Sequence, residues 1–460
     1  MNIFFKFLIT GIIFTLFSCP GIDLDTKKNT DETINVNVQS VKGSDDLWFD
    51  DTKHHVIRIT MDQAVYTTMA KEHNYDFDNQ FRLVTLFSFD DVTMDKVAIK
   101  CRGNTTSNND NGGDGTNKKS YVIAFDCTDP LNTADPASAN KRAFLSGNDD
   151  RKFYGEKEIN LRTSPNDPSL IREMLSYKIY RENGVPAPRV STVSVYLNQI
   201  FLGVYLLVEE VDKRLLKKHF ENNDGNLYKC GYSGSGGATF NAYTYDAGRY
   251  SLATNKKTGD VSDIQTLLSS LSAVDSKDSL AQYFDVTNVL NYIAVSSITG
   301  HWDSLSGNYN NDYVYHNPAD NKWYVVAWDT DNSFGSDWIG NTLNLPYYLT
   351  NSRSSQSALF CKKAVQYAEP ELKAIFKELL TKYMNKNVLE NEADRIRDLI
   401  KDEVFKDPFL LDYQSFYESY DKLPAKDAFK NQKMEQYRSG LGVKEYFKER
   451  LEVINNEINP

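Results

Sequence analysis

Several signatures of common protein classes are missing from this 460-residue sequence. Its five cysteines form no CxxC pair and no Cys/His spacing typical of zinc ligands. No GxGxxG motif, internal repeat or coiled-coil heptad pattern is present. Basic residues are in deficit, with 52 Lys and Arg against 63 Asp and Glu, and the net charge of −11 argues against a nucleic-acid surface. A metal-bound nucleotide remains compatible with that charge.

The first apolar run, residues 7–17, is too short to span a membrane comfortably. It ends in Leu16-Phe17-Ser18-Cys19, which resembles a bacterial lipobox and implies cleavage before Cys19 and acylation of that residue. We therefore expect a signal peptide (1–18), a polar tether (19–46) and a cell-envelope protein that meets the membrane through its lipid anchor, at the periplasmic face or outer surface of an outer membrane. The alternative is an ordinary secretory signal with a chance cysteine.

The other cysteines are Cys101, Cys127, Cys230 and Cys361. An exported location permits disulfides. Cys101 and Cys127 both lie at the edges of expected strands and could pair, but buried free thiols fit the sequence equally well.

Oxygen-bearing side chains gather around one expected hairpin, strands 313–315 and 323–328. The loop before it holds Asp303, Asn308, Asn310, Asn311 and Asp312, and Asp329 and Asp331 follow it. Such hard ligands suit Mg²⁺ or Mn²⁺ held against a phosphate. Asp and Asn are also common turn residues, but an acidic residue ending an apolar strand is costly without a partner. An EF-hand is excluded because Gly335 comes one position late and Gly340 stands where the bidentate Glu belongs.

Upstream, strands are expected over 56–60, 82–89, 96–100 and 118–125. The last begins with Lys118-Lys119, and period-two alternation places Lys119 on the face of Tyr121. The Asn/Gly-rich loop before it, residues 104–117, is either a solvent turn or a nest for phosphates. A strand over 158–162 and a helix from Asp167 to Gly184, capped by Asp167, come next. That helix carries Glu173, which could equally be a solvated surface residue.

A hairpin follows over residues 189–208, then an acidic linker over 209–212 and a basic helix over 213–220. This order is typical of two lobes joined by a short linker. Further helices are expected over 264–271, 285–298, 372–384, 388–401 and 443–458. The fold class is therefore α+β.

Taken in order, these segments resemble the CotH family of atypical protein kinases, known from spore coats. The resemblance rests on RGNTT, KKSYVIAF, NLRTSPNDPSLIREMLSYKIYRENGVPAPR, FLGVYLLVEEVDKRLLKKHF, GNLYK, HWDS, NNDYVYHN and WYVVAWDTDNSFG, from about Val56 to Trp338. It implies a protein-kinase-like two-lobed fold, with a β-rich N-lobe (47–208) and a mainly helical C-lobe (209–460).

The resemblance also implies roles for individual residues. Asp303 would be the catalytic base and Asp329 the metal ligand, helped by Asp331 and by Asn308 or Asn311, of which Asn311 aligns better. The nucleotide-binding residues would be Lys119 as first choice, Lys118, Glu173 as the partner of the lysine, Arg102, and Glu209 and Glu210 of the linker. The implied cofactors are ATP with Mg²⁺ or Mn²⁺.

Three features depart from the family pattern or mislead. Val97-Ala98-Ile99-Lys100 spells the VAIK of ordinary kinases but precedes RGN, so we interpret it as coincidence. Asp312 replaces an aromatic residue, and the 104–117 loop is long and very polar.

Two functions compete. One is a kinase that phosphorylates Ser or Thr of exported proteins; the other is a non-catalytic adhesin or scaffold with a kinase-like fold. The first is favoured because Lys119, Glu173, Asp303 and Asp329 are all present. A carbohydrate-binding lipoprotein would rest only on Trp302, Trp323, Trp328 and Trp338, most of which are better explained as core.

Overall fold

The computed structural model describes residues 40–70, 81–102, 118–126, 150–164, 167–234, 236–241, 244–336, 342–348, 357–384, 387–410, 413–421 and 442–460. All of them belong to one unit, residues 39–460. None of the helices in these ranges is long and apolar enough to cross a membrane.

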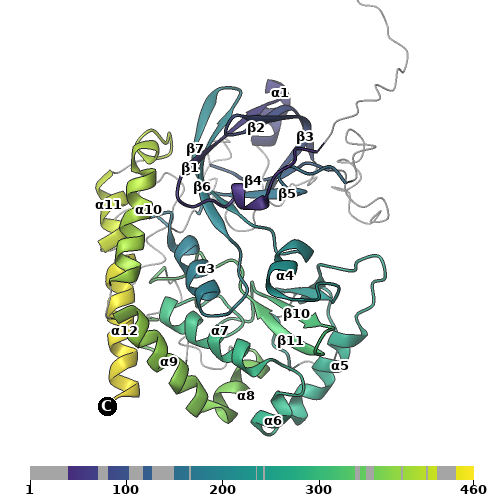
Figure 1. Cartoon of the computed structure of the whole chain (residues 1–460), viewed down its shortest axis with the longest axis vertical. Coiled ribbons are helices and arrows are strands. Elements are labelled where there is room, and N and C mark those ends of the chain that lie inside the picture. Colours follow the sequence, from purple (N-terminus) through teal and green to yellow (C-terminus); the bar gives the residue numbers. More distant parts are fainter. Residues whose placement is uncertain are drawn as a thin grey trace, which may run out of the picture. The chain divides into compact units, whose positions relative to one another are not determined.

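Seven strands close into a barrel in the order β1-β2-β3-β4-β5-β7-β6 (Figure 1). All neighbours are antiparallel except β1 and β6, whose parallel pairing closes the barrel. The strands are β1 (His54–Thr60), β2 (Arg82–Phe89), β3 (Val92–Arg102), β4 (Ser120–Ala124), β5 (Glu158–Arg162), β6 (Val190–Leu197) and β7 (Ile200–Val208). Most of the predicted strands are confirmed, and β2 and β5 have the predicted bounds.

The barrel interior is apolar and includes Trp48 from the segment before β1. Its indole Nε1 donates to the carbonyl of Phe153 over 2.9 Å, so a buried polar atom is satisfied while the ring fills the core. At the β6–β7 turn, Asn198 and Gln199 both have positive φ, as a two-residue hairpin turn requires. The predicted hairpin is thus confirmed.

A second sheet follows in the order β11-β10-β8-β9. Its strands are β8 (Leu227–Cys230), β9 (Tyr250–Leu252), β10 (Tyr313–Asn317) and β11 (Lys322–Val326). β10 and β11 pair from Tyr313 opposite Val326 to Asn317 opposite Lys322, which confirms the predicted central hairpin. β11 ends two residues earlier than predicted.

Helices α9, α10, α11 and α12 pack together beside α7 and β7 (Figure 1). Their bounds are α1 (Gln63–Ala70), α3 (Arg172–Glu182), α4 (Lys213–His219), α5 (Ser262–Ser270), α6 (Lys277–Leu280), α7 (Val286–Thr299), α8 (Leu359–Tyr367), α9 (Glu369–Met384), α10 (Val388–Val404), α11 (Tyr413–Asp421) and α12 (Val443–Ile458), with single 3₁₀ turns η1 (Asp45–Leu47) and η3 (Leu271–Ala273). The protein is therefore a mixed α+β structure, as predicted.

Helix α7 precedes the loop that leads into the β10–β11 hairpin. Asp285 caps its start by accepting from the backbone N–H of Asn288 over 2.7 Å. Gly300 ends it in the left-handed region at φ 65°. A Cβ at that position would lie 2.0 Å from the hydroxyl of Tyr446, so both conformation and space require glycine. The next residues form the loop that carries Asp303.

Candidate active site

Asp312 ties together the three segments that meet at this site. Its carboxylate accepts from the Tyr292 hydroxyl of α7 at 2.5 Å, from the Leu305 N–H of the loop at 3.0 Å and from the Trp328 N–H after β11 at 3.1 Å. Burial raises the pKa of Asp312 to about 7, even though these donors oppose the shift. Asp312 thus anchors the loop.

Asp303 lies in a cage of three side-chain amides. Asn308 donates to it over 2.7 Å, Asn311 over 2.9 Å and Asn310 over 3.3 Å. Burial raises the pKa of Asp303 to about 6, and the nearby charge of Asp329 adds to the rise. Neutral donors therefore hold the carboxylate in place.

The amide oxygen of Asn308 accepts a bond from the Tyr232 hydroxyl at 2.9 Å. Asn311, at φ 70°, also donates to the backbone carbonyl of Asp303 over 2.8 Å. Because Tyr232 already donates to the side-chain oxygen of Asn308, Asn311 is the better candidate metal ligand of the two.

Asp329 follows β11 with a left-handed backbone, φ 57°. Its carboxylate forms an ion pair with the Arg162 guanidinium at the end of β5, and its N–H donates to the Tyr177 hydroxyl over 2.9 Å. Burial alone would raise the pKa of Asp329, but Arg162, Lys229 and Arg102 outweigh it and hold the pKa below its usual value. Asp329, at the end of the strand, therefore has the oppositely charged partner that a buried carboxylate requires, and that partner is Arg162.

Glu173 is fully buried in the first turn of α3, so the solvent-exposed alternative is wrong. Its Oε2 lies 3.1 Å from Arg162 Nε, and its Oε1 accepts from the Tyr177 hydroxyl over 2.9 Å. Burial raises the pKa of Glu173 despite the guanidinium. The predicted partner was Lys119; the structure places Arg162 at this carboxylate instead.

The helix that carries Glu173 begins later than predicted. Leu170 has φ 61°, which is incompatible with a helix from Pro168 onward, and α3 starts at Arg172. Asp167 still serves the helix start, because its carboxylate accepts from the Arg172 N–H over 2.7 Å and pairs with the Arg172 side chain at 2.5 Å. The predicted end at Gly184, φ 75°, is confirmed.

Asp331 is the fourth acid of the site, after Asp303, Asp329 and Glu173. It is 4.0 Å from Arg162, and burial together with the charge of Asp329 raises its pKa well above the usual value. Four carboxyl groups, those of Glu173, Asp303, Asp329 and Asp331, therefore influence one another at one end of the hairpin.

Three cations surround the ring of Trp328, next to Asp329. Arg102, Arg162 and Lys229 lie 5.4, 5.7 and 5.9 Å from its centroid. Burial lowers the pKa of Lys229, and Arg102 adds to that effect. Three cationic side chains therefore lie beside the acids, a charge arrangement that could bind an anionic group.

Lys118 and Lys119 precede β4, which begins at Ser120, so the alternation used to choose Lys119 does not extend to either residue. Both are buried. Lys118 Nζ lies 2.7 Å from Asp407 Oδ2 and 2.6 Å from the carbonyl of Val204. It thereby joins β4 and β7 to the segment after α10. The phosphate-binding role of Lys119 stays a prediction.

The linker after β7 holds Glu209 and Glu210, as predicted. Glu209 is buried between Arg189 and Lys218, at 2.7 and 2.5 Å. Glu210 Oε2 accepts from Asn160 Nδ2 over 2.5 Å and lies 3.7 Å from Arg102. Both side chains are held by protein groups.

Other predicted residues fall outside the site or outside the described residues. Trp302, Trp323 and Trp328 are buried, as expected of core residues, and Trp338 is not among the described residues. Cys19, Cys127 and the 104–117 loop are not described either, so the Cys101–Cys127 pair stays a prediction. Cys230 and Cys361 are buried.

Sequence reasoning missed Arg162, Lys229 and Tyr177, and it named Asn310 in the loop without giving it a role. The motif NLRTSP places Arg162 at the end of a short apolar strand, just as Asp329 stands at the end of another apolar strand. Because an unpaired buried guanidinium is costly, the sequence already indicated that Arg162 needs an acidic partner.

One protein family and several known proteins are similar to this chain. A family model described as "CotH kinase protein" matches residues 99–458. "Inner spore coat protein H" of Bacillus subtilis (strain 168) is 26% identical over 274 residues, which are 56% of this chain and 72% of that protein. "Invasin CotH7" of Rhizopus delemar is 27% identical over 198 residues, 41% of this chain and 33% of that protein. "Spore coat protein homolog 1" of the same organism is 26% identical over 184 residues, 38% and 30% of the two chains. The chain thus covers about a third of each Rhizopus protein.

Proposed function

The chain belongs to the CotH kinase protein family, and from that membership we propose that it transfers the γ-phosphate of ATP to Ser or Thr hydroxyls of exported or surface proteins. The observation that carries the proposal is the meeting of Asp303 and Asp329 beside the Arg162–Glu173 pair.

The order of elements supports a kinase-like reading. In protein kinases a strand bearing a phosphate-facing lysine precedes the helix whose glutamate pairs with it, and a metal-binding aspartate follows a later hairpin. Here β5 precedes α3, and Arg162 of β5 pairs with Glu173 of α3. The barrel and the chain after residue 208 would then be the two lobes, with Glu209 and Glu210 in the linker against the adenine.

A divalent metal fits the donor set. Asp329, Asp331 and Asn311 offer only oxygen ligands, which Mg²⁺ or Mn²⁺ prefers. Burial raises the pKa of both Asp331 and Glu173, and the charge of Asp329 adds to each rise despite Arg162. A bound metal would supply charge neutralisation for the transferring phosphate.

The protein residues then have separable roles. Asp303, held by three amides, would accept the proton of the acceptor hydroxyl. Arg102, Lys229 and Lys119 would contact phosphate oxygens, and Arg162 would hold Glu173 and Asp329 in register. With Cys19 acylated, the protein would act on substrates in the cell envelope.

A second candidate, a non-catalytic surface adhesin or scaffold, is favoured by the similarity to a protein named "Invasin CotH7". Calorimetry with MgATP and a phosphotransfer assay on residues 45–460 separates the two. In the kinase, Asp329→Ala abolishes metal-dependent nucleotide binding, whereas Asp303→Ala keeps binding and lowers kcat by about 10²-fold or more. A wild-type protein without metal-dependent nucleotide binding would contradict the kinase and leave the adhesin or scaffold as the remaining candidate.

A further inference from the structure

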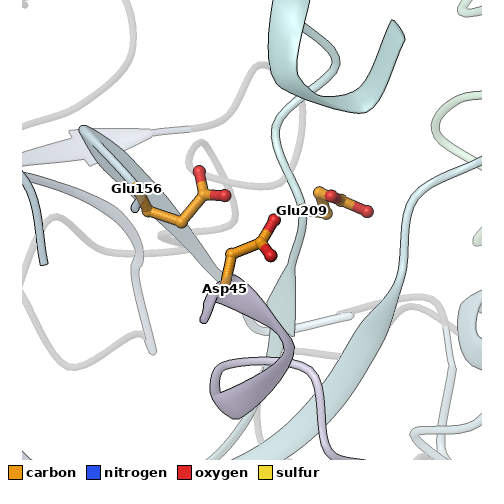
Figure 2. A group of neighbouring side chains, drawn as sticks. All are labelled: Asp45, Glu156 and Glu209. Carbon is orange, nitrogen blue, oxygen red and sulfur yellow. The ribbon is translucent and has the colours of Figure 1, made fainter. Parts of the chain in front are cut away.

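A second group of carboxylates lies away from the candidate active site, where the segment before the barrel meets the linker. Asp45 comes from η1, Glu156 from the turn before β5 and Glu209 from the residue after β7 (Figure 2). One oxygen from each can be chosen so that all three lie within 4.8 Å of one another. Three segments that are far apart in the sequence thus each place one carboxylate in the same small region.

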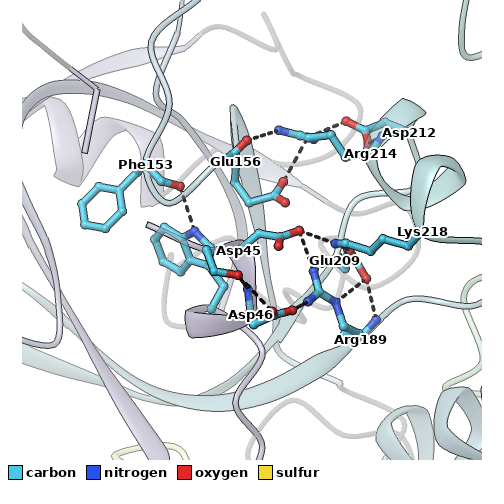
Figure 3. Close-up of polar contacts among 12 residues, drawn as sticks. Asp45, Asp46, Phe153, Glu156, Arg189, Glu209, Asp212, Arg214 and Lys218 are labelled. Carbon is cyan, nitrogen blue, oxygen red and sulfur yellow. Dashed lines mark hydrogen bonds and ion pairs between the residues drawn. The ribbon is translucent and has the colours of Figure 1, made fainter. Parts of the chain in front are cut away.

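Three cations already contact this group of three acids. Lys218 contacts Asp45 and Glu209, and Arg189 contacts both as well as Asp46 (Figure 3). Arg214 pairs with Glu156 at 3.0 Å and with Asp212 at 2.5 Å. Arg189 and Arg214 thus also serve acids outside the group, Asp46 and Asp212, whose side chains are 79% and 33% exposed.

Glu156 points to a missing ligand. It is 2% exposed, and its Oε1 atom has no hydrogen-bond partner among the described residues, although Arg214 satisfies Oε2. Burial raises the pKa of Glu156 to about 7 despite Arg214, and Glu209 and Asp212 add to the rise. A buried carboxylate oxygen without a donor is costly unless a proton or a cation reaches it.

We propose that Asp45, Glu156 and Glu209 bind a calcium ion, which fastens the segment before the barrel to the linker between β7 and α4. All the ligands are oxygens, which excludes a preference for zinc. Calcium suits acids from three separate segments better than magnesium, because its coordination geometry is flexible, whereas Mg²⁺ demands near-ideal octahedral geometry and usually binds one or two carboxylates together with substrate phosphates. The ion would supply the partner that Glu156 Oε1 lacks in the described part of the chain.

Lys218 makes the proposal sharply testable. Its ammonium contacts two of the three proposed ligands, so it competes with the ion for Asp45 and Glu209. The side chains of Asp45 and Lys218 are 23% and 31% exposed, so an ion can reach the site once Lys218 turns outward. Removing the lysine should therefore strengthen calcium binding, whereas in a purely structural ion-pair network it would create no calcium effect.

Calcium titration by calorimetry on nucleotide-free residues 40–460 tests this. We expect one saturable site with Kd of about 10⁻⁴ to 10⁻³ M, the weak class of calcium sites. The site should persist in Asp329→Asn, which removes the predicted catalytic metal ligand. Glu156→Gln, close in shape, should weaken binding about tenfold or more, and Lys218→Met should tighten it severalfold. Asp224→Asn, an exposed acid paired with Lys213, is the matched control and should bind as wild type does.

The proposal is overturned if wild type binds no calcium, if Glu156→Gln binds as tightly as wild type, or if Asp329→Asn abolishes binding. Circular dichroism checks that each variant is folded. Should Lys218→Met not fold, the comparison of Glu156→Gln with Asp224→Asn decides alone.

Discussion

Arg162 offers the most direct test of how the candidate active site is held together. Its guanidinium forms ion pairs with Glu173 and Asp329 and lies 4.0 Å from Asp331. Its side chain is 13% exposed and that of Glu173 is fully buried, so solvent screens the interaction little. Removing one partner of a buried ion pair costs about 3–5 kcal/mol because the other charge is left uncompensated. We therefore expect Arg162→Met to lose about 3–5 kcal/mol of unfolding free energy near pH 8.

The loss should depend on pH with a defined sign. Without the guanidinium, burial and mutual repulsion raise the pKa values of Glu173, Asp329 and Asp331 in the folded variant above those in the unfolded chain. The folded variant then binds more protons than the unfolded one, so its stability falls as pH rises from about 4 through those raised values. The deficit relative to wild type should be larger at pH 8 than at pH 5.

Urea unfolding at both pH values measures the effect. Arg395→Met is the matched control, because Arg395 pairs with Glu392 and Asp51 at a more exposed position, where such pairs contribute about 0–1 kcal/mol. A loss below about 1 kcal/mol for Arg162→Met, or a deficit that does not change with pH, would refute the assigned role of this arginine.

Four further outcomes are expected. Asp312→Asn should lower the free energy of unfolding, measured in urea, by about 2–4 kcal/mol, because the amide NH₂ would face backbone N–H groups whose hydrogen bonds the carboxylate accepts. If Asp303 is the base, kcat/KM should fall with decreasing pH below about 6, since burial raises its pKa to about 6 and only the ionised form accepts a proton; a flat profile from pH 5 to 8 contradicts this. Lys119→Met should weaken ATP binding in calorimetry more than Lys100→Met, and the reverse order would show the wrong lysine was chosen. Cys19→Ala should move the protein from the membrane fraction to the soluble fraction, and retention after a high-salt wash contradicts acylation.

The hairpin and its acids could be predicted because each signal is local. Apolar runs set β10 and β11, and polar residues at their ends had to lie at the ends of the hairpin. Asp285 and Gly300 mark the ends of α7 by capping rules that act within one turn. Such features depend on neighbours in sequence, so one sequence suffices to find them.

The partners of those acids could not be predicted in the same way. Arg162 and Asp329 are 167 positions apart, and nothing in either neighbourhood indicates the other. Lys119 was chosen by extending strand alternation backward, but the strand begins only at Ser120. The start of α3 was displaced because the left-handed backbone of Leu170 is not signalled by its residue type. Each miss arises where tertiary contacts override a local preference.

The identity of the cation beside Glu173 has a consequence for the proposed reaction. On the proposed function, a metal bound to Asp329 would share that carboxylate with Arg162, whose guanidinium contacts it. A guanidinium has five donors in a rigid fork, and Arg162 uses Nε toward Glu173 and Nη2 toward Asp329. It can therefore release Asp329 and turn that nitrogen toward a phosphate oxygen while Nε stays on Glu173. An ammonium, as a single point charge, would have to leave one partner to reach the other. On the proposed function, arginine at this position allows the site to exchange an internal ion pair for a metal and a phosphate without leaving Glu173 uncompensated at any stage.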